Sequence, residues 1–149
     1  TYKYGKEITS TATPYIGREF MGWYSGEELL STDTTYTFMV DKDVTAEFVA
    51  KEEMRDFSFT STATTCEITG LIDETVTEVV IPDYVTSIGD WAFSSCKSLT
   101  SLVIPNSVTY IGCAAFEDCS SLTSIVIPDK LYRIFLSFAH IDISYSPVV

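Results

Sequence analysis

Apolar residues recur in the second half of the chain at a step of 23 residues. A short strand-like segment ending in Pro occurs three times, and its prolines are Pro82, Pro105 and Pro128. Fixed periods of about 20 to 50 residues are typical of proteins whose repeats stack on one another. The pattern therefore predicts stacked coils of 23 residues. Other positions that repeat at this step are Val85 and Val108, Ile88 and Ile111, Phe93 and Phe116, and Cys96 and Cys119.

The residue types predict the course of one coil. Leu102 and Ile104 occupy alternate positions, so their side chains point to the same side of a strand, and we expect that side to be the core. Pro105 has no N–H and ends the strand. Gly112 permits a tight turn. Residues 113–119, with Ala-Ala-Phe at their centre, are predicted to form a helical turn that drives Phe116 inward.

The third repeat departs from the pattern after Pro128. Leu131 and Ile134 keep their phase, but the glycine and the cysteine of the earlier coils are lost. Terminal repeats are commonly atypical because they cover the open end of the stack. Residues 129–149 are therefore predicted to form a C-terminal cap. An exposed apolar tail that associates with another molecule, including a second copy, is the alternative.

This repeat closely resembles the BspA-like leucine-rich repeats of bacterial surface proteins. The resemblance covers about residues 63–135 and is carried by residues 99–121, LTSLVIPNSVTYIGCAAFEDCSS. Residues 66–82 resemble the entry segment that precedes the first full unit. The resemblance implies a short leucine-rich-repeat solenoid for residues 63–149.

The first 51 residues have a different texture, rich in Thr, Tyr and Phe and without the 23-residue phase. Alternation predicts strands near residues 2–13, 19–24, 35–40 and 44–49, and it favours a hairpin between the last two. Asp41-Lys42-Asp43 would form its turn. Residues 27–30 are predicted to form one helical turn.

Residues 1–51 look like a divergent internalin-type B repeat. The resemblance is centred on Gly22-Trp23 and on the segment Val44-Thr45-Ala46-Glu47-Phe48. It implies a small β-grasp-like module. The charged run that follows predicts a linker over residues 52–62. The expected fold class is thus mainly β, with a β-grasp-like module followed by a solenoid.

The acidic composition bears on partners. The formal net charge is −12, with 21 acidic and 9 basic residues in 149. Phosphate backbones and anionic headgroups are repelled by such a chain, so nucleic acid and membrane surfaces are not expected partners. No stretch approaches the roughly 20 apolar residues that span a bilayer. No signal peptide is recognisable at Thr1, and we interpret the chain as a mature or excised segment.

Catalytic and metal-binding patterns were not found in the sequence. His140 is the only histidine, and Cys113 and Cys119 are too far apart for a typical zinc pair. Cys96 and Cys119 share one repeat phase, so we expect them to be buried and reduced. Asp41-Lys42-Asp43 lacks the Gly and the distal Glu of a calcium loop. We therefore expect no enzyme activity, no cofactor and no metal.

The repeat phase predicts which side chains face outward. If Leu102 and Ile104 point inward, one face of the sheet carries a row of valines beside a polar row. A plain β surface without a ligand is the alternative reading of this face, and Trp23, Tyr24 and Trp91 are other candidate aromatic anchors, with Trp23 expected in the core. The candidate binding residues on the sheet face are Glu78, Val80, Ser101, Val103, Ser124 and Val126.

These features favour a non-enzymatic segment of a bacterial cell-surface or secreted protein. Extended faces of repeat proteins commonly bind partners. The family resemblance implies adhesion or protein interaction, with a protein or glycan on a host or neighbouring cell as the partner. A structural spacer without a ligand, and a carbohydrate-binding accessory domain of a secreted enzyme, are the alternatives.

Overall fold

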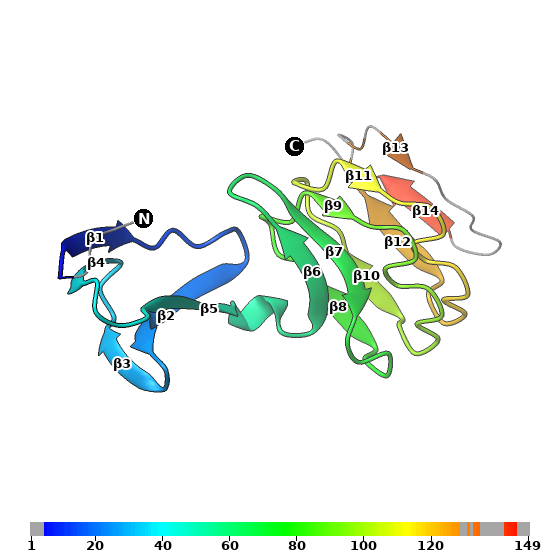
Figure 1. Ribbon diagram of the computed structural model, residues 1–149. Coiled ribbons are helices and arrows are strands. Elements are labelled where there is room, and N and C mark those ends of the chain that lie inside the picture. The colour runs from blue at the N-terminus through cyan, green and yellow to red at the C-terminus, as the bar shows by residue number, and fades with distance from the viewer. Residues whose placement is uncertain (1–4, 129–130, 132, 135–141, 146–149) are drawn as a thin grey trace. The chain divides into compact units, whose positions relative to one another are not determined.

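The chain forms two compact units, Thr1–Lys51 and Glu52–Val149 (Figure 1). The computed structural model describes residues 5–128, 131, 133–134 and 142–145. The regular structure of these residues is almost entirely β-strand, with one short 3-10 helix. The expectation of a mainly β protein is therefore confirmed. Each unit is described separately below.

Unit 1 contains two small antiparallel sheets (Figure 1). One sheet pairs β1 with β4, and the other has the strand order β3-β2-β5. The β-grasp likeness expected for this unit stays a prediction. The strands are β1 (Glu7–Thr11), β2 (Arg18–Ser25), β3 (Glu28–Ser31), β4 (Thr35–Met39) and β5 (Thr45–Ala50).

Two predictions for unit 1 are wrong. β4 and β5 do not form a hairpin, because β4 pairs with β1 and β5 pairs along most of β2. Asp41-Lys42-Asp43 instead lies in a connection between strands of different sheets. Residues 27–30 are not helical but enter strand β3, because Gly26 adopts a φ of 61° and turns the chain back into a β2–β3 hairpin.

Aromatic packing explains the strand partners that alternation alone left open. Trp23 is 6% exposed, and its indole N–H donates to the carbonyl oxygen of Asp33 at 3.0 Å. Its ring lies 5.8 Å from Phe20 and 6.3 Å from Tyr36, measured between ring centroids. Phe20 in turn contacts Phe48 of β5. The expected core position of Trp23 is confirmed.

Residues 52–62 differ from the linker that their charges predicted. They contain the 3-10 helix η1 (Glu52–Met54) and strand β6 (Phe57–Ser61). Met54 is fully buried and Phe57 is 5% exposed, whereas Glu52, Glu53 and Arg55 remain in solvent. The charged run is thus the solvated side of a turn that inserts its apolar residues into unit 2.

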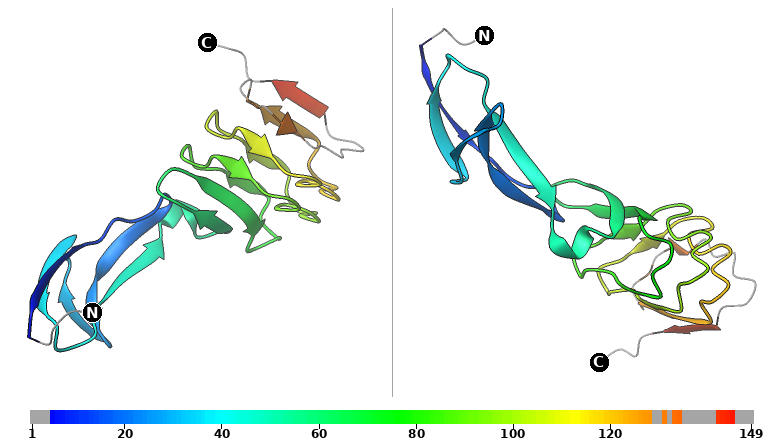
Figure 2. Two further views of the ribbon diagram at one scale, coloured as in Figure 1. Left: turned by 45° about the horizontal axis from the view of Figure 1, so that its top comes forward. Right: turned by 90° about the horizontal axis from the view of Figure 1, so that it is seen from below.

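Unit 2 winds into coils whose strands form two sheets (Figures 1 and 2). One sheet is parallel with the order β14-β12-β10-β8; in the other, of order β13-β11-β9-β7-β6, only β6 is antiparallel to its neighbour. The remaining strands are β7 (Cys66–Leu71), β8 (Glu78–Val80), β9 (Ser87–Ile88), β10 (Ser101–Val103), β11 (Tyr110–Ile111), β12 (Ser124–Ile127), β13 (Arg133–Ile134) and β14 (Asp142–Tyr145).

The register follows the 23-residue period from β8 through β10 to β12, and from β9 through β11 to β13. Val103 pairs with Val80 in the preceding coil and with Val126 in the next. Ile111 pairs with Ile88 in the other sheet. Because equivalent residues of successive coils are direct neighbours, one buried position in the repeat becomes a continuous buried row.

Rows of identical side chains fill the core of unit 2. The rings of Phe93 and Phe116 stack with centroids 5.3 Å apart and an interplanar angle of 13°. Phe57 extends this row by an edge contact with Phe93, at 6.4 Å between centroids. Phe116 is 2% exposed, so its predicted inward direction is confirmed.

The helical turn predicted for residues 113–119 is wrong. Ala114 and Asp118 have φ values of 51° and 58°, and a left-handed residue ends a right-handed helix. Trp91 and Ser95, one repeat earlier, have φ values of 60° and 62°. These segments instead bond to one another: the N–H groups of residues 91, 93 and 95 donate to the carbonyls of residues 113, 115 and 117.

The C-terminal cap predicted for residues 129–149 falls largely outside the described residues, namely at 129–130, 132, 135–141 and 146–149. Within the described part, β13 pairs with β11 and β14 pairs with β12. One further parallel strand is thus added to each sheet after the last regular coil.

Gly112 is required for space rather than for the turn freedom that the sequence suggested. Its φ is not in the left-handed region, but a Cβ atom there would overlap the backbone N and Oδ1 of Asp90 in the preceding coil. We expect Gly112→Ala to lower the free energy of unfolding by about 2–3 kcal/mol, since neither backbone can move without disturbing the stack. Urea unfolding followed by circular dichroism measures this.

Gly70→Ala is the matched control, because its added Cβ would lie an ordinary 3.6 Å from the Ser58 side chain. We expect that variant to unfold within about 1 kcal/mol of the parent, in either direction. Equal stability of the two alanine variants would contradict the close approach of the coils at Gly112.

Candidate functional site

The six residues predicted to form a binding face lie together on the outer side of β8, β10 and β12. Val80, Val103 and Val126 are 70%, 53% and 43% exposed. The polar partners, Glu78, Ser101 and Ser124, are also exposed. We call the three valines the valine stripe. The structure therefore places these side chains as the repeat phase predicted, and whether they bind a partner stays a proposal.

Strand alternation fixes the direction of the valine stripe. Val79, Leu102 and Ile125 occupy the intervening positions and are 7%, 4% and 1% exposed. Burial of these side chains holds each strand in one orientation, because a shift of one residue would exchange the core face for the solvent face. The valines are thus held outward by the core beneath them.

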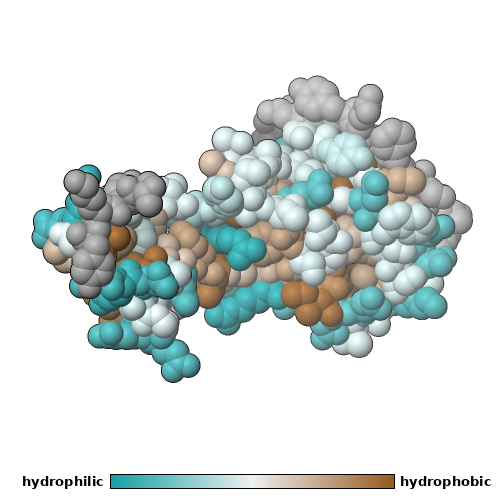
Figure 3. Space-filling view, viewed as in Figure 1, coloured by the Kyte–Doolittle hydropathy of each residue, from teal (hydrophilic) through white to brown (hydrophobic). Residues whose placement is uncertain are grey.

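The stripe spans two strand spacings, or about 10 Å. The register continues into β14, where Asp142 pairs with Ser124 and Ser144 pairs with Val126. The exposed fraction of the valines falls along the stack, and Val80 lies on the end strand of the sheet. Figure 3, drawn from the same side as Figure 1, shows that hydrophobic and hydrophilic residues are mixed on this face of unit 2.

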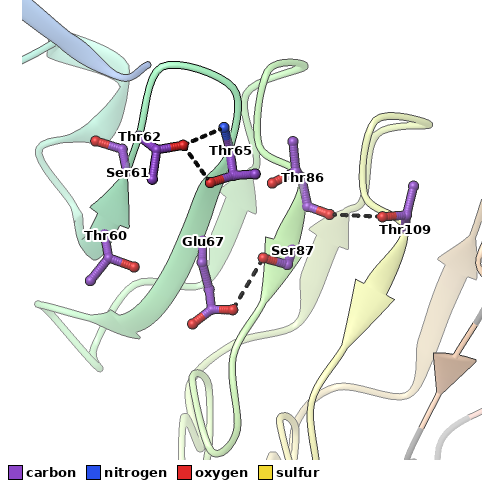
Figure 4. A pocket seen from close by; sticks show the side chains of 8 residues that line it. All are labelled: Thr60, Ser61, Thr62, Thr65, Glu67, Thr86, Ser87 and Thr109. Atoms are coloured by element: carbon purple, nitrogen blue, oxygen red, sulfur yellow. Dashed lines mark hydrogen bonds between the residues drawn. The ribbon is translucent and has the colours of Figure 1, made fainter. Parts of the chain in front are cut away.

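A hydroxyl-lined hollow lies beside the second sheet (Figure 4). Its volume is about 420 Å³. Glu67 is its only carboxylate, and the Ser87 hydroxyl donates to Glu67 Oε2 at 3.2 Å. Sequence reasoning missed this hollow, although the repeat of Thr86 as Thr109 was a signal for a threonine row. Its lining residues are Thr60, Ser61, Thr62, Thr65, Glu67, Thr86, Ser87 and Thr109.

Most of the threonine hydroxyls in this hollow form hydrogen bonds within unit 2. The Thr86 hydroxyl donates to the carbonyl of Cys66 at 3.0 Å, and the Thr109 hydroxyl lies 3.4 Å from the carbonyl of Thr86. The hydroxyls of Thr62 and Thr65 bond to each other at 2.8 Å. Fewer hydroxyls therefore remain for a ligand than the lining suggests.

Two of the candidate aromatic anchors differ sharply in exposure. Trp91 is 56% exposed and has a φ of 60°, a conformation that is costly for a bulky residue. The backbone N–H of Trp91 donates to Cys113 at 3.0 Å. Trp23 is in the core of unit 1, and Tyr24 is half-buried. Trp91 is thus an exposed aromatic side chain in the turn segment that follows β9.

Unit 1 has its own shallow hollow, of about 460 Å³, which the sequence did not suggest. Tyr15 is 54% exposed there and Phe48 is half-buried. An aromatic surface with one guanidinium group suits a polar or anionic ligand, yet the hollow carries no set of groups for catalysis. It is lined by Thr13, Tyr15, Arg18 and Phe48.

None of the four cysteines is in a disulfide, and three of them are buried: Cys66, Cys96 and Cys119. Burial raises the pKa of the Cys119 thiol to about 11 and also raises that of Cys96. The Cys119 thiol lies 2.9 Å from the carbonyl oxygen of Phe93, to which it donates. The expectation that Cys96 and Cys119 are buried is confirmed, and their reduced state stays a prediction. A thiol that stays protonated at neutral pH is a poor nucleophile.

Within the described part of the chain, no group of three or more His, Cys, Asp and Glu side chains could hold a metal ion. In the same part, no helix is long and apolar enough to cross a membrane. His140 lies outside the described residues.

The chain matches two protein families, one for each half. Residues 71–142 match the BspA type leucine rich repeat region (6 copies), and residues 1–52 match the divergent InlB B-repeat domain. These two matches are the ones that the sequence resemblances indicated, and they follow in the same order along the chain. No curated protein and no solved structure matches it.

The difference in burial predicts that one thiol reacts alone. In the native protein at pH 8, we expect Cys113 to react with a chromogenic disulfide reagent within minutes, because it is exposed. The three buried thiols should react only on unfolding. Cys113→Ser should remove the fast phase, whereas Cys96→Ser should leave it unchanged. A fast phase that survives Cys113→Ser would contradict the burial of the other thiols.

Proposed function

We propose that this chain is a non-enzymatic protein-interaction and adhesion module of a bacterial cell-surface or secreted protein. The observation that carries the proposal is the valine stripe on the outer face of β8, β10 and β12. Both matched families are of repeat types found in surface proteins and are typically non-catalytic. The partner of this module would be a protein or glycan on a host or neighbouring cell.

The exposure of the valine stripe supports a binding role. Apolar area removed from water contributes about 25 cal/mol per Å². The stripe gains little of this in the folded chain, because the three side chains remain in solvent. β-Branched side chains also lose little conformational freedom when a partner covers them. An aligned row in three successive coils presents a flat surface suited to another protein.

The two halves have different parts in this proposal. Residues 1–51 would form a B-repeat module with a β-grasp-like fold, and residues 63–149 a leucine-rich-repeat solenoid with an atypical end over 129–149. The solenoid presents the stripe, and the B-repeat module serves as a neighbouring spacer or second contact surface. Self-association through the apolar C-terminal segment is a further possible contact.

Carbohydrate binding is the second candidate function, and the hollow of Figure 4 favours it. Its hydroxyl groups and Glu67 match the hydrogen-bonding groups of a sugar. Lining residues contribute no aromatic ring for stacking. A spacer that binds nothing is the third candidate. Binding to a panel of proteins and glycans separates the three candidates.

Replacement of the three valines tests the proposal. The triple variant Val80→Thr, Val103→Thr and Val126→Thr keeps the β-branched shape but removes apolar surface. On a panel of purified extracellular matrix proteins and glycans, we expect the parent chain to bind at least one protein with micromolar affinity. The triple variant should bind that protein at least tenfold more weakly by surface plasmon resonance.

Ile72→Thr is the control, since Ile72 is 64% exposed and lies outside the stripe. It should retain parental affinity, and both variants should unfold near the parental temperature. Protein binding that survives the triple substitution would overturn the role of the stripe. Binding to glycans alone, lost in Glu67→Gln, would favour the carbohydrate function, and binding to no panel member would favour the spacer.

A further inference from the structure

Negative charge is concentrated in unit 2. Residues 52–128 contain eleven acidic and two basic side chains, which gives a net charge of 2 − 11 = −9, whereas residues 1–51 contribute 5 − 8 = −3. Residues 129–149 are balanced, with two of each, and the sum is the −12 of the whole chain. The coils that present the valine stripe therefore carry most of the charge.

Neither of the two cations in residues 52–128 neutralises the sheet that bears the stripe. Arg55 pairs with Glu52 at 2.6 Å, and both belong to the segment that contains η1. Lys97 lies in the turn between β9 and β10, where its N–H donates to the carbonyl oxygen of Ser95. The strands β8, β10 and β12 contain no basic residue.

An acidic residue begins the polar row beside the stripe. Glu78 begins the row on β8, and its side chain is exposed. The row continues through Ser101 and Ser124, and the next register position, on β14, is Asp142. An apolar row about 10 Å long is thus flanked by a polar row that starts with the exposed carboxylate of Glu78.

We infer that the partner of this face is a basic polypeptide segment in an extended conformation. The inference rests on the proposed function and adds the chemistry of the partner to it. An extended segment repeats its side-chain direction every second residue, so apolar residues can cover the valines. Lysine or arginine side chains beside them then reach the carboxylate of Glu78 and the serine hydroxyls of the polar row.

Charge decides against the other classes of partner. An acidic protein, a sulfated glycan or an anionic bilayer would approach a unit with a net charge of −9 against long-range repulsion. A basic segment is attracted instead, and complementary potentials mainly raise the association rate and the selectivity. Binding by this surface is therefore expected to weaken as salt screens the attraction.

Synthetic ten-residue peptides test the inference with the full chain. The first alternates Lys with Val, the second Glu with Val and the third Lys with Ser. We expect the Lys-Val peptide to bind at least tenfold more tightly than either other peptide, as measured by fluorescence anisotropy at 50 mM salt. Its affinity should fall at least fivefold at 300 mM salt.

Two variants locate the binding on the proposed surface. Val103→Thr should weaken the Lys-Val peptide severalfold, and Glu78→Gln should do so while also reducing its dependence on salt. Glu117→Gln is the matched control, because Glu117 lies in a turn segment rather than on the sheet face. It removes the same charge and should leave the affinity within twofold of the parent.

Three results would overturn the inference. Equal binding of the Glu-Val peptide would remove the preference for basic partners, and absence of Lys-Val binding would remove the partner class. Equal effects of Glu78→Gln and Glu117→Gln would mean that the attraction depends on the net charge of the unit and not on the sheet face. None of these results would affect the valine-dependent binding of an extracellular matrix protein. Failure of this inference is therefore distinct from failure of the proposed function.

Discussion

Parallel pairing between residues 23 positions apart is the constraint on which unit 2 depends. It places Val103 against Val80 and Val126, and Ile111 against Ile88. A single coil cannot bury its apolar residues, whereas a stack turns each of them into part of a continuous row. The phenylalanine row, the close approach at Gly112 and the valine stripe all follow from the same register.

Much of unit 2 could be predicted because a repeat converts sequence phase into spatial position. Leu102 and Val103 were assigned to opposite faces from their phase alone, and their burial agrees. The turn conformation was not predictable, because Ala114 gives no signal of a positive φ and Asp118 gives only a weak one. The hollow beside Glu67 was also not predicted, because part of its lining comes from β6, whose residues lie outside the repeat.

Unit 1 was harder to predict because alternation identifies a strand but not its partner. The segment 35–39 was recognised as a strand, yet it pairs with β1 rather than with the strand that follows it. The packing of Trp23 against Phe20 and Tyr36 connects the elements, and such contacts between distant residues leave no local signal. The charged run at 52–56 predicted a linker. Burial of Met54 instead ties this segment to the core of unit 2, and this contact likewise leaves no local signal.

The outward valines of three successive coils form a row whose length depends on the number of coils. Each of the three coils adds one valine at one strand spacing, about 4.8 Å, and Ser144 takes the next register position on β14. If a partner covers the row as proposed, its apolar contact is limited to these three positions. The number of coils that carry an outward valine, rather than any individual side chain, then sets the length of partner that the row can hold.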